Sequence, residues 1–123
     1  MKLAGWTLVG LLATAAHARD ELTVPLMIAS SPHAFAGRTV SVLCSVTRLD
    51  LGTYACPAAD QIGRHLANIT IKLEEMSEAD QRYIVSRCSA KSAVQPCDLV
   101  IVGTVEVSEN GALSLSRPWL KLF

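Results

Sequence analysis

The clearest pattern in this chain is the alternation of apolar and polar residues over positions 38–48. A period of two with β-branched residues is typical of a strand that buries one face. Leu43 is the one apolar residue on the otherwise polar face. Residues 50–52 carry a turn signal, so residues 53–56 are expected to return as a short strand that ends at Pro57. The apolar positions of the first strand are Val40, Val42, Cys44 and Val46.

Three further segments are expected to be strands. Residues 68–74 alternate again, with isoleucine and leucine on one side, and residues 99–107 form the most apolar strand candidate. The dipeptide Asn110-Gly111 comes next and is a strong signal for a tight hairpin turn. Residues 112–116 are therefore expected to pair back along the preceding strand.

One helix is expected, over residues 77–87. Ser77 is a good N-cap, and the acidic residues that follow it in the first turn complement the helix dipole. Before the first strand, residues 22–28 are an edge strand at best because a proline interrupts them, and residues 29–37 are expected to be a loop. Residues 58–66 are expected to be a polar loop or a helical turn. The predicted order is three strands, the helix and two more strands.

The first eighteen residues have the plan of a secretory signal peptide. Lys2 is a short basic start, residues 3–13 are apolar, and the Ala-His-Ala sequence at 16–18 suits cleavage. A membrane-spanning helix needs roughly 20 apolar residues, and this run is shorter, so we expect cleavage of residues 1–18 and no membrane insertion afterwards. Residues 19–123 are then a single exported domain, periplasmic or secreted, and the short signal suits a bacterium.

Charge and motifs disfavour several partners and activities. Cleavage removes Lys2 from the eleven basic residues and leaves all eleven acidic residues, so the net charge of the mature chain is about −1. No basic tract with interleaved aromatic residues points to nucleic acid. The chain carries none of the common motifs for nucleophilic, metal-dependent or phosphate-binding enzymes, so we expect no enzymatic activity, no metal and no cofactor.

Four cysteines in an exported domain predict two disulfides, which four residues can form in three ways. A zinc site is disfavoured because no two cysteines have the spacing of zinc ligands. Folding the chain about Asp50 brings Cys44 opposite Cys56, at a separation that a disulfide can span. Cys88 and Cys97 mark the exit of the helix and the entry of the next strand, so their pairing would tie the helix to the sheet. The crossed pairing, Cys44–Cys88 with Cys56–Cys97, would tie the helix to the first strand instead.

The predicted order of strands and helix is similar to that of the oligonucleotide/oligosaccharide-binding (OB) barrel. Residues 37–46 resemble its first strand, and residues 97–105 resemble its fourth, where a glycine such as Gly103 commonly allows a sharp bend. Over residues 37–117 the chain resembles the exported bacterial members of this superfold. The resemblance implies an all-β fold with one helix, in which five strands form an OB-like barrel and the helix lies between strands 3 and 4.

The resemblance also implies where a ligand would bind. Small OB barrels bind ligands across strands 2 and 3 and the loops between strands 1 and 2 and between strands 4 and 5. Tyr54 is the only aromatic residue on that surface and is expected to be exposed there. Trp119 is a further aromatic residue that could close the barrel, anchor an interface or stack on a sugar. The candidate binding residues are Arg48, Asp50, Tyr54, Lys72 and Asn110.

Two functions are consistent with these features. The first is a non-enzymatic interaction module whose ligand is a protein, a peptide or a small molecule. The second is a glycan-binding domain that forms a homo-oligomeric ring, similar to the B subunits of bacterial AB5 toxins, which are also exported, disulfide-bonded OB barrels of about this length. An exposed aromatic residue beside polar loop residues would favour the second function.

We expect the exported protein to begin at or near Arg19, because the Ala-His-Ala sequence follows a short apolar run. N-terminal sequencing of protein recovered from the periplasm or the medium measures the cleavage site directly. Exported material that still begins with Met1 would contradict the prediction.

Overall fold

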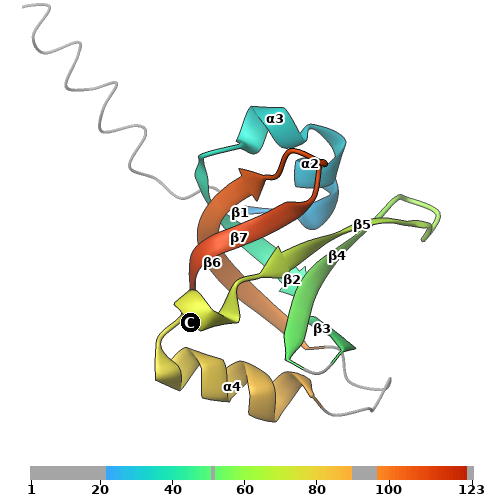
Figure 1. Ribbon diagram of the computed structural model, residues 1–123. Coiled ribbons are helices and arrows are strands. Elements are labelled where there is room, and N and C mark those ends of the chain that lie inside the picture. Colours follow the sequence, from blue (N-terminus) through green and yellow to red (C-terminus); the bar gives the residue numbers. More distant parts are fainter. Residues whose placement is uncertain (1–21, 51, 90–96, 122–123) are drawn as a thin grey trace, which may run out of the picture.

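The computed structural model describes residues 22–50, 52–89 and 97–121, which form a mostly β fold with few helices (Figure 1). The signal peptide predicted over residues 1–18 lies outside the described residues. The helical elements are α2 Pro25–Ser30, α3 Pro32–Phe35, the 3-10 turn η1 Leu73–Glu75 and α4 Glu78–Cys88. The strands are β1 Leu22–Thr23, β2 Thr39–Ser45, β3 Thr47–Asp50, β4 Thr53–Ala59, β5 His65–Ile71, β6 Asp98–Val107 and β7 Leu113–Leu120.

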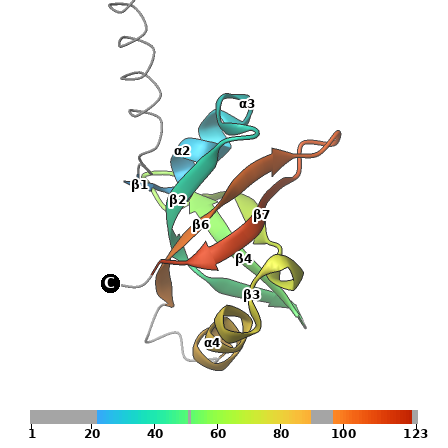
Figure 2. The same ribbon diagram turned by 90° about the vertical axis from the view of Figure 1, so that its left-hand side faces the viewer.

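One mixed sheet contains all the described strands, in the order β1-β2-β6-β7-β5-β4-β3. Neighbouring strands are antiparallel except for β1–β2 and β5–β7, which are parallel. The sheet has seven strands where the sequence predicted five, because β1 is added and the first predicted strand is broken into β2 and β3. The break falls at Val46, whose backbone N–H donates to the carbonyl oxygen of Cys97 at 2.8 Å. Figure 2 shows β2, β6 and β7 along the side that faces the viewer.

The inner face of the sheet is lined by the apolar positions of the predicted strands. All four apolar residues of the first predicted strand are buried, which confirms the alternation seen in the sequence. Ile69, Ile101 and Leu115, from β5, β6 and β7, are fully buried. Ile28 of α2 and Ile84 of α4 belong to the same apolar cluster. Because each large aliphatic side chain contributes about 1.5–3 kcal/mol on burial, this cluster holds the helices to the sheet.

The segment before β2 is largely helical, so the expectation of an edge strand over 22–28 and a loop over 29–37 is wrong for most of its length. Only Leu22–Thr23 is extended. Pro25 and Pro32 each occupy the first turn of a helix, where the missing N–H of proline is not needed. Pro25, which argued against a strand, and Pro32, in the expected loop, are therefore helix starts.

β4 and β5 form a longer hairpin than the sequence predicted. β4 continues to Ala59 and β5 begins at His65, so the loop expected over 58–66 is only a short turn. Pro57 does not end the strand, which corrects the predicted boundary. β3 pairs with β4 only as far as Ala55, so Pro57 lies where β4 is an edge strand, and edge strands tolerate proline.

The next two elements lie close to their predicted positions. The strand expected over 68–74 ends at Ile71, and η1 follows it. The helix expected over 77–87 is α4. The hydroxyl of Ser77 accepts a hydrogen bond from the backbone N–H of Asp80 at 3.2 Å, so Ser77 caps this helix as predicted.

Two carboxylates attach the helical segment to the free edge of β7. β5 pairs with β7 only as far as Leu115, so the later amides of β7 need other partners. A carboxylate oxygen of Glu75 accepts from the N–H of Arg117 at 2.7 Å, and one of Asp80 accepts from the N–H of Leu120 at 3.1 Å. These bonds position η1 and the start of α4 against the end of β7.

The two predicted disulfides, Cys44–Cys56 and Cys88–Cys97, are both present. Cys88 is the last residue of α4, and Cys97 directly precedes β6, as the prediction required. The second disulfide therefore ties the helix to the sheet. Two disulfides indicate an oxidising, extracellular environment.

The strand register from which Cys44–Cys56 was predicted is nevertheless wrong. β3 and β4 pair Thr47 with Ala55, so the hairpin ladder does not place Cys44 opposite Cys56. Cys44 is instead the ladder partner of Leu99 in β6. The disulfide crosses from β2 to β4, with a Cα separation of 5.2 Å, and joins two strands that do not pair with each other in the described sheet.

Gly103 lies at an irregularity in the β6–β7 ladder. The two strands pair regularly on either side of it, but β7 carries one extra residue opposite Gly103, and Arg117 in this bulge has a φ of 47°. A Cβ atom on Gly103 would lie 3.2 Å from the Cβ of Leu115 and 3.3 Å from the carbonyl oxygen of Ser116. The close approach of β7 therefore favours a glycine at this position, because any larger residue would push the two strands slightly apart.

We expect replacement of Cys44 and Cys56 by alanine to destabilise the protein more than replacement of Cys88 and Cys97. The sequence separations are 12 and 9 residues, so each disulfide should contribute about 2–3 kcal/mol by restricting the unfolded chain. Cys44 and Cys56 are also fully buried, and their loss removes packing worth about 1 kcal/mol more. Urea unfolding of the two double variants measures the difference. Equal losses would contradict the assigned role of the first disulfide in the core.

The substitution Gly103→Ala should lower the free energy of unfolding by about 1–3 kcal/mol, because the added methyl group overpacks the β6–β7 contact. Ser114→Ala, on the outward side of β7, is the control and should change stability by less than about 0.5 kcal/mol. Thermal unfolding of both variants tests this. A wild-type melting temperature for Gly103→Ala would show that the two strands have room to spare.

Candidate functional site

Two of the predicted binding residues, Arg48 and Asp50, lie on β3 and are exposed. The Nε of Arg48 donates to the backbone carbonyl oxygen of Asp50 at 3.4 Å, so the guanidinium lies along its own strand, β3. Figures 1 and 2 place the β3–β4 end of the molecule at the bottom and the β6–β7 turn at the top. The structure therefore does not bring Arg48 and Asp50 together with Asn110, which lies in the β6–β7 turn.

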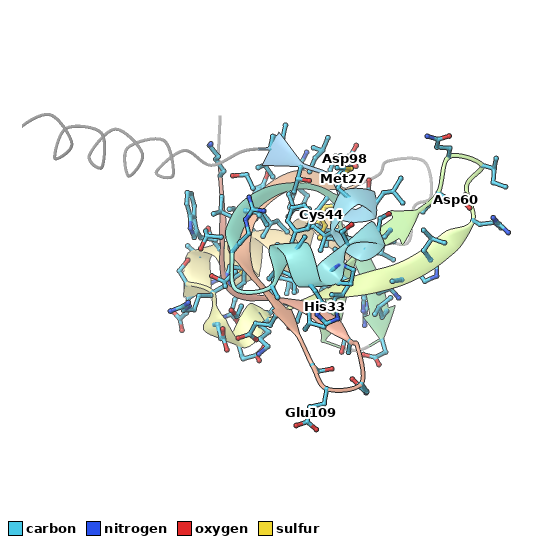
Figure 3. The ribbon with its side chains drawn as sticks, turned by 90° about the horizontal axis from the view of Figure 1, so that it is seen from above. Met27, His33, Cys44, Asp60, Asp98 and Glu109 are labelled. Atoms are coloured by element: carbon cyan, nitrogen blue, oxygen red, sulfur yellow. A yellow bond between two sulfur atoms is a disulfide. The ribbon has the colours of Figure 1, made fainter. Side chains whose placement is uncertain are left out.

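Asn110 helps to shape the turn in which it lies. The hydroxyl of Ser108 donates to its Oδ1, and the N–H of Ala112 lies 3.3 Å from the same oxygen. Gly111 has a φ of 86°, which a side chain other than glycine adopts with strain. The hairpin predicted from Asn110-Gly111 is therefore present, and the side-chain amide oxygen of Asn110 accepts hydrogen bonds that stabilise its turn. Figure 3 shows Glu109, from the same turn, projecting away from the body of the molecule.

Tyr54 is buried, and the expectation that it is exposed for stacking is wrong. Its exposed fraction is only 2%. The β4–β5 register places it opposite Ile71 on the inner face, and its hydroxyl shares a hydrogen bond with the hydroxyl of Ser89, just after α4. The ring is thus part of the core, and its polar group is satisfied by the end of the helix.

Lys72 is held by an ion pair with Glu106. The Nζ of Lys72 lies 2.7 Å from the Oε1 of Glu106, and both side chains are partly exposed. The hydrogen bond to Glu106 raises the pKa of Lys72, and the same bond lowers the pKa of Glu106. Because each charge is neutralised by the other, Lys72 offers an anionic ligand less attraction than an unpaired lysine would.

The outward face of the strands around Lys72 is polar and built from small residues. Ladder pairing aligns these residues in one row that crosses β3, β4, β5, β7 and β6. The row contains no aromatic ring on which a base or a sugar could stack. Its members are Thr47, Ala55, Thr70, Ser114 and Glu106.

A second group of outward-facing side chains is apolar, and we call it the outer patch. Ladder pairing places Leu22, Val102 and Trp119 in one row across β1, β2, β6 and β7, with Leu43 and Val100 in the next row. Trp119 is 47% exposed, so it does not belong to the core, and the role in closing a barrel that the sequence offered for it is not supported. Val100 and Val102 are buried but lie outside the inner apolar cluster, so they form the floor of the patch. The outer patch consists of Leu22, Leu43, Val100, Val102 and Trp119.

A buried hydroxyl lies within this patch. Ser41 is the ladder partner of both Leu22 and Val102 and is almost fully buried. Its Oγ has no hydrogen-bond partner in the part of the chain that the structure describes. A buried hydroxyl without a partner is uncommon in native proteins. The Ser41 hydroxyl is thus a single buried polar group surrounded by the apolar side chains of the outer patch.

The far end of the β4–β5 hairpin carries two exposed apolar side chains, one in the turn and one at the start of β5, which we call the apolar tip. Its residues are Ile62, which is 77% exposed, and Leu66, which is 50% exposed. Figure 1 shows this hairpin projecting from the body, and Figure 3 shows Asp60 near its far end. Exposed apolar residues are common singly, but here they occupy the end of a projecting element.

Asp60 fixes the backbone that carries the apolar tip. Its Oδ1 accepts from the N–H groups of Ile62 at 3.0 Å and Arg64 at 2.8 Å, and its Oδ2 lies 3.0 Å from the Nε of Arg64. The N–H of Gly63 donates to the carbonyl oxygen of Asp60 at 3.0 Å, with a φ of 87° at Gly63. The hydrogen bond from the Arg64 backbone is the main reason that the pKa of Asp60 is lowered. The turn is therefore built as a fixed shape.

Sequence reasoning missed the apolar tip and recognised parts of the outer patch. Residues 58–66 were expected to be a polar loop, although Asp60 and Gly63 flank Ile62 in a spacing typical of a tight turn. Leu43 was visible as an apolar residue on a polar strand face, and Trp119 as a possible interface anchor. The link between those two residues depends on the long-range pairing of β2, β6 and β7.

Within the described ranges, no three His, Cys, Asp or Glu side chains come together as a metal site. None of the described helices combines the length and the apolar character that crossing a bilayer would need. The candidate surfaces in the described part of the chain are the apolar tip and the outer patch.

Comparison of the chain with protein-family models, with curated proteins and with solved structures found no match.

Proposed function

We propose that this chain is an exported, non-enzymatic binding module that is built on an OB-like barrel and recognises its ligand with the β4–β5 hairpin. The observation that carries the proposal is the apolar tip, in which Ile62 is exposed on a turn of fixed shape and Leu66 is exposed at the start of β5.

The strand order supports the OB-like barrel. β2 and β3 stand far apart in the sheet order, yet only Val46 separates them in the chain, so together they can serve as one bent first strand. β4, β5, β6 and β7 would then be strands 2 to 5, with the parallel β5–β7 pair as the link between strands 3 and 5. α4 lies between β5 and β6 in the chain, which is the place of the helix in the OB order.

Export is supported by two separate features. The signal-peptide pattern over residues 1–18 directs the chain out of the cytoplasm. The disulfides Cys44–Cys56 and Cys88–Cys97 persist in oxidising compartments and are rare in the cytosol. We therefore place the working protein in the periplasm or outside the cell.

The hairpin is well suited to recognition because its shape is set before binding. A loop that is already ordered loses little conformational entropy when it meets a partner, so more of the contact energy appears as affinity. Ile62 would bury most of its side chain in the contact. A ligand with an apolar pocket of protein or peptide origin matches such a tip better than a sugar, which prefers aromatic rings. Tyr54 is buried, and the exposed Trp119 lies on a strand among apolar side chains and not beside polar loop residues, so we do not propose the glycan-binding ring.

We expect a photo-reactive phenylalanine analogue at position 62 to cross-link to a discrete partner when cells that export the protein are irradiated. The same analogue at position 109, which projects from the β6–β7 turn, is the matched control and should give no adduct at comparable yield. Electrophoresis and mass spectrometry identify the products. An adduct at position 109 but none at position 62, or equal adducts at both, would contradict the assignment of the hairpin as the recognition element.

A further inference from the structure

The apolar tip and the outer patch lie on opposite sides of the molecule. Figure 1 shows the β4–β5 hairpin projecting to the right of the body. Figure 2 looks at the left-hand side of that view, and the strands that face the viewer are β2, β6 and β7, which carry most of the outer patch. The hairpin of one molecule therefore cannot reach its own outer patch.

We propose that the apolar tip of one molecule docks on the outer patch of a second copy, so that the protein associates head to tail. This inference rests on the proposed function, because it takes the hairpin as the recognition element, and it names the partner as another copy of this chain. The tip is a narrow projection, and the patch is a sheet face with a buried floor. A heterologous contact joins two different surfaces of the same protein, and these two surfaces meet that condition.

Charge supports this pairing of surfaces. The guanidinium of Arg64, beside Ile62, uses its Nε for Asp60 and is largely exposed. At the edge of the patch, Asp98 is exposed in the ladder row next to Leu43, and its Oδ1 accepts from the hydroxyl of Ser45. Asp98 forms no ion pair within the described part of the chain, so its carboxylate can receive Arg64 of another copy.

The edge of the outer patch also carries a positively charged residue. Lys121 follows β7, and its backbone N–H donates to the carbonyl oxygen of Val100, which places it at the edge of the outer patch. At the tip, the carboxylate of Asp60 is already paired with Arg64 within the turn. The tip thus presents the Asp60–Arg64 pair, and the edge of the patch presents Asp98 and Lys121. The contact would join Arg64 to Asp98 through the guanidinium nitrogens that Asp60 does not hold.

The available area indicates a weak association. A fully exposed large side chain offers on the order of 200 Å², so Ile62, Leu66, Leu22, Leu43 and Trp119 together expose roughly 500 Å² of mostly apolar surface. Stable complexes bury about 1,200–2,000 Å² in total, and the polar surroundings of both surfaces must supply the rest. The association should therefore depend strongly on concentration. A head-to-tail contact closes into a ring or extends into a chain, depending on the rotation between copies.

A charge-reversal experiment tests the contact. Sedimentation velocity over a concentration series, with protein that begins at Arg19, should show self-association of the wild type. Arg64→Glu and Asp98→Lys should each weaken it about tenfold or more, and the double variant should recover most of the loss. Arg82→Glu is the matched control, because Arg82 forms the same kind of exposed pair, with Glu78 four residues away on α4, and should have no effect.

Two outcomes overturn the inference: a wild type that stays monomeric at every concentration, or association that Ile62→Asp and the charge reversals leave unchanged. Melting temperatures of the variants show that they remain folded, as expected for exposed positions. A monomeric protein that still cross-links at position 62 to a different protein overturns the self-association and leaves the binding module standing. A monomer without any cross-link at position 62 overturns both.

Discussion

The rest of the structure depends on the bond between Cys44 and Cys56. It joins β2 to β4, which are remote from each other in the hydrogen-bonded order of the sheet. Both sulfur atoms are completely buried in the inner cluster. In the described sheet, backbone hydrogen bonds connect β2 to β4 only through β6, β7 and β5, so the disulfide provides the direct connection across the core. The inward positions of the remaining strands then pack around a covalent centre.

The outward face of the same sheet is divided into a polar and an apolar half. β6 contributes to both, because Glu106 lies in the polar row and Val100 and Val102 lie in the outer patch. On the inner side the strand is continuously apolar, with Ile101 and Val105 in the core. The inner face of β6 is buried over its whole length, and half of its outer face is buried as well. Such a strand has a long, nearly continuous apolar sequence. This explains why residues 99–107 stood out in the sequence.

Local patterns predicted the parts of the fold that depend on local physics. The period of two identified the buried face of β2, Asn110-Gly111 identified the last hairpin, and Ser77 identified the start of α4. The failures concern pairing at long range: whether Pro57 sits at an edge, which face Tyr54 joins, and where β2 gives way to β3. Neither the outer patch nor the apolar tip could be predicted from local sequence. Leu43 and Trp119 come together only because both strands pair with β6. The exposure of Ile62 depends on how far β4 and β5 extend.

The turn at the end of β4–β5 is maintained by main-chain groups together with Asp60 and Gly63, while the side chains of Ile62 and Leu66 take no part in holding it. Asp60 and Gly63, which set its geometry, are thus separate from the apolar side chains that the turn exposes. Substitutions at positions 62 and 66 can therefore change the exposed surface of the tip without a large loss of stability. Single amino-acid changes there can vary the contact surface that the hairpin presents while the turn beneath it keeps its shape.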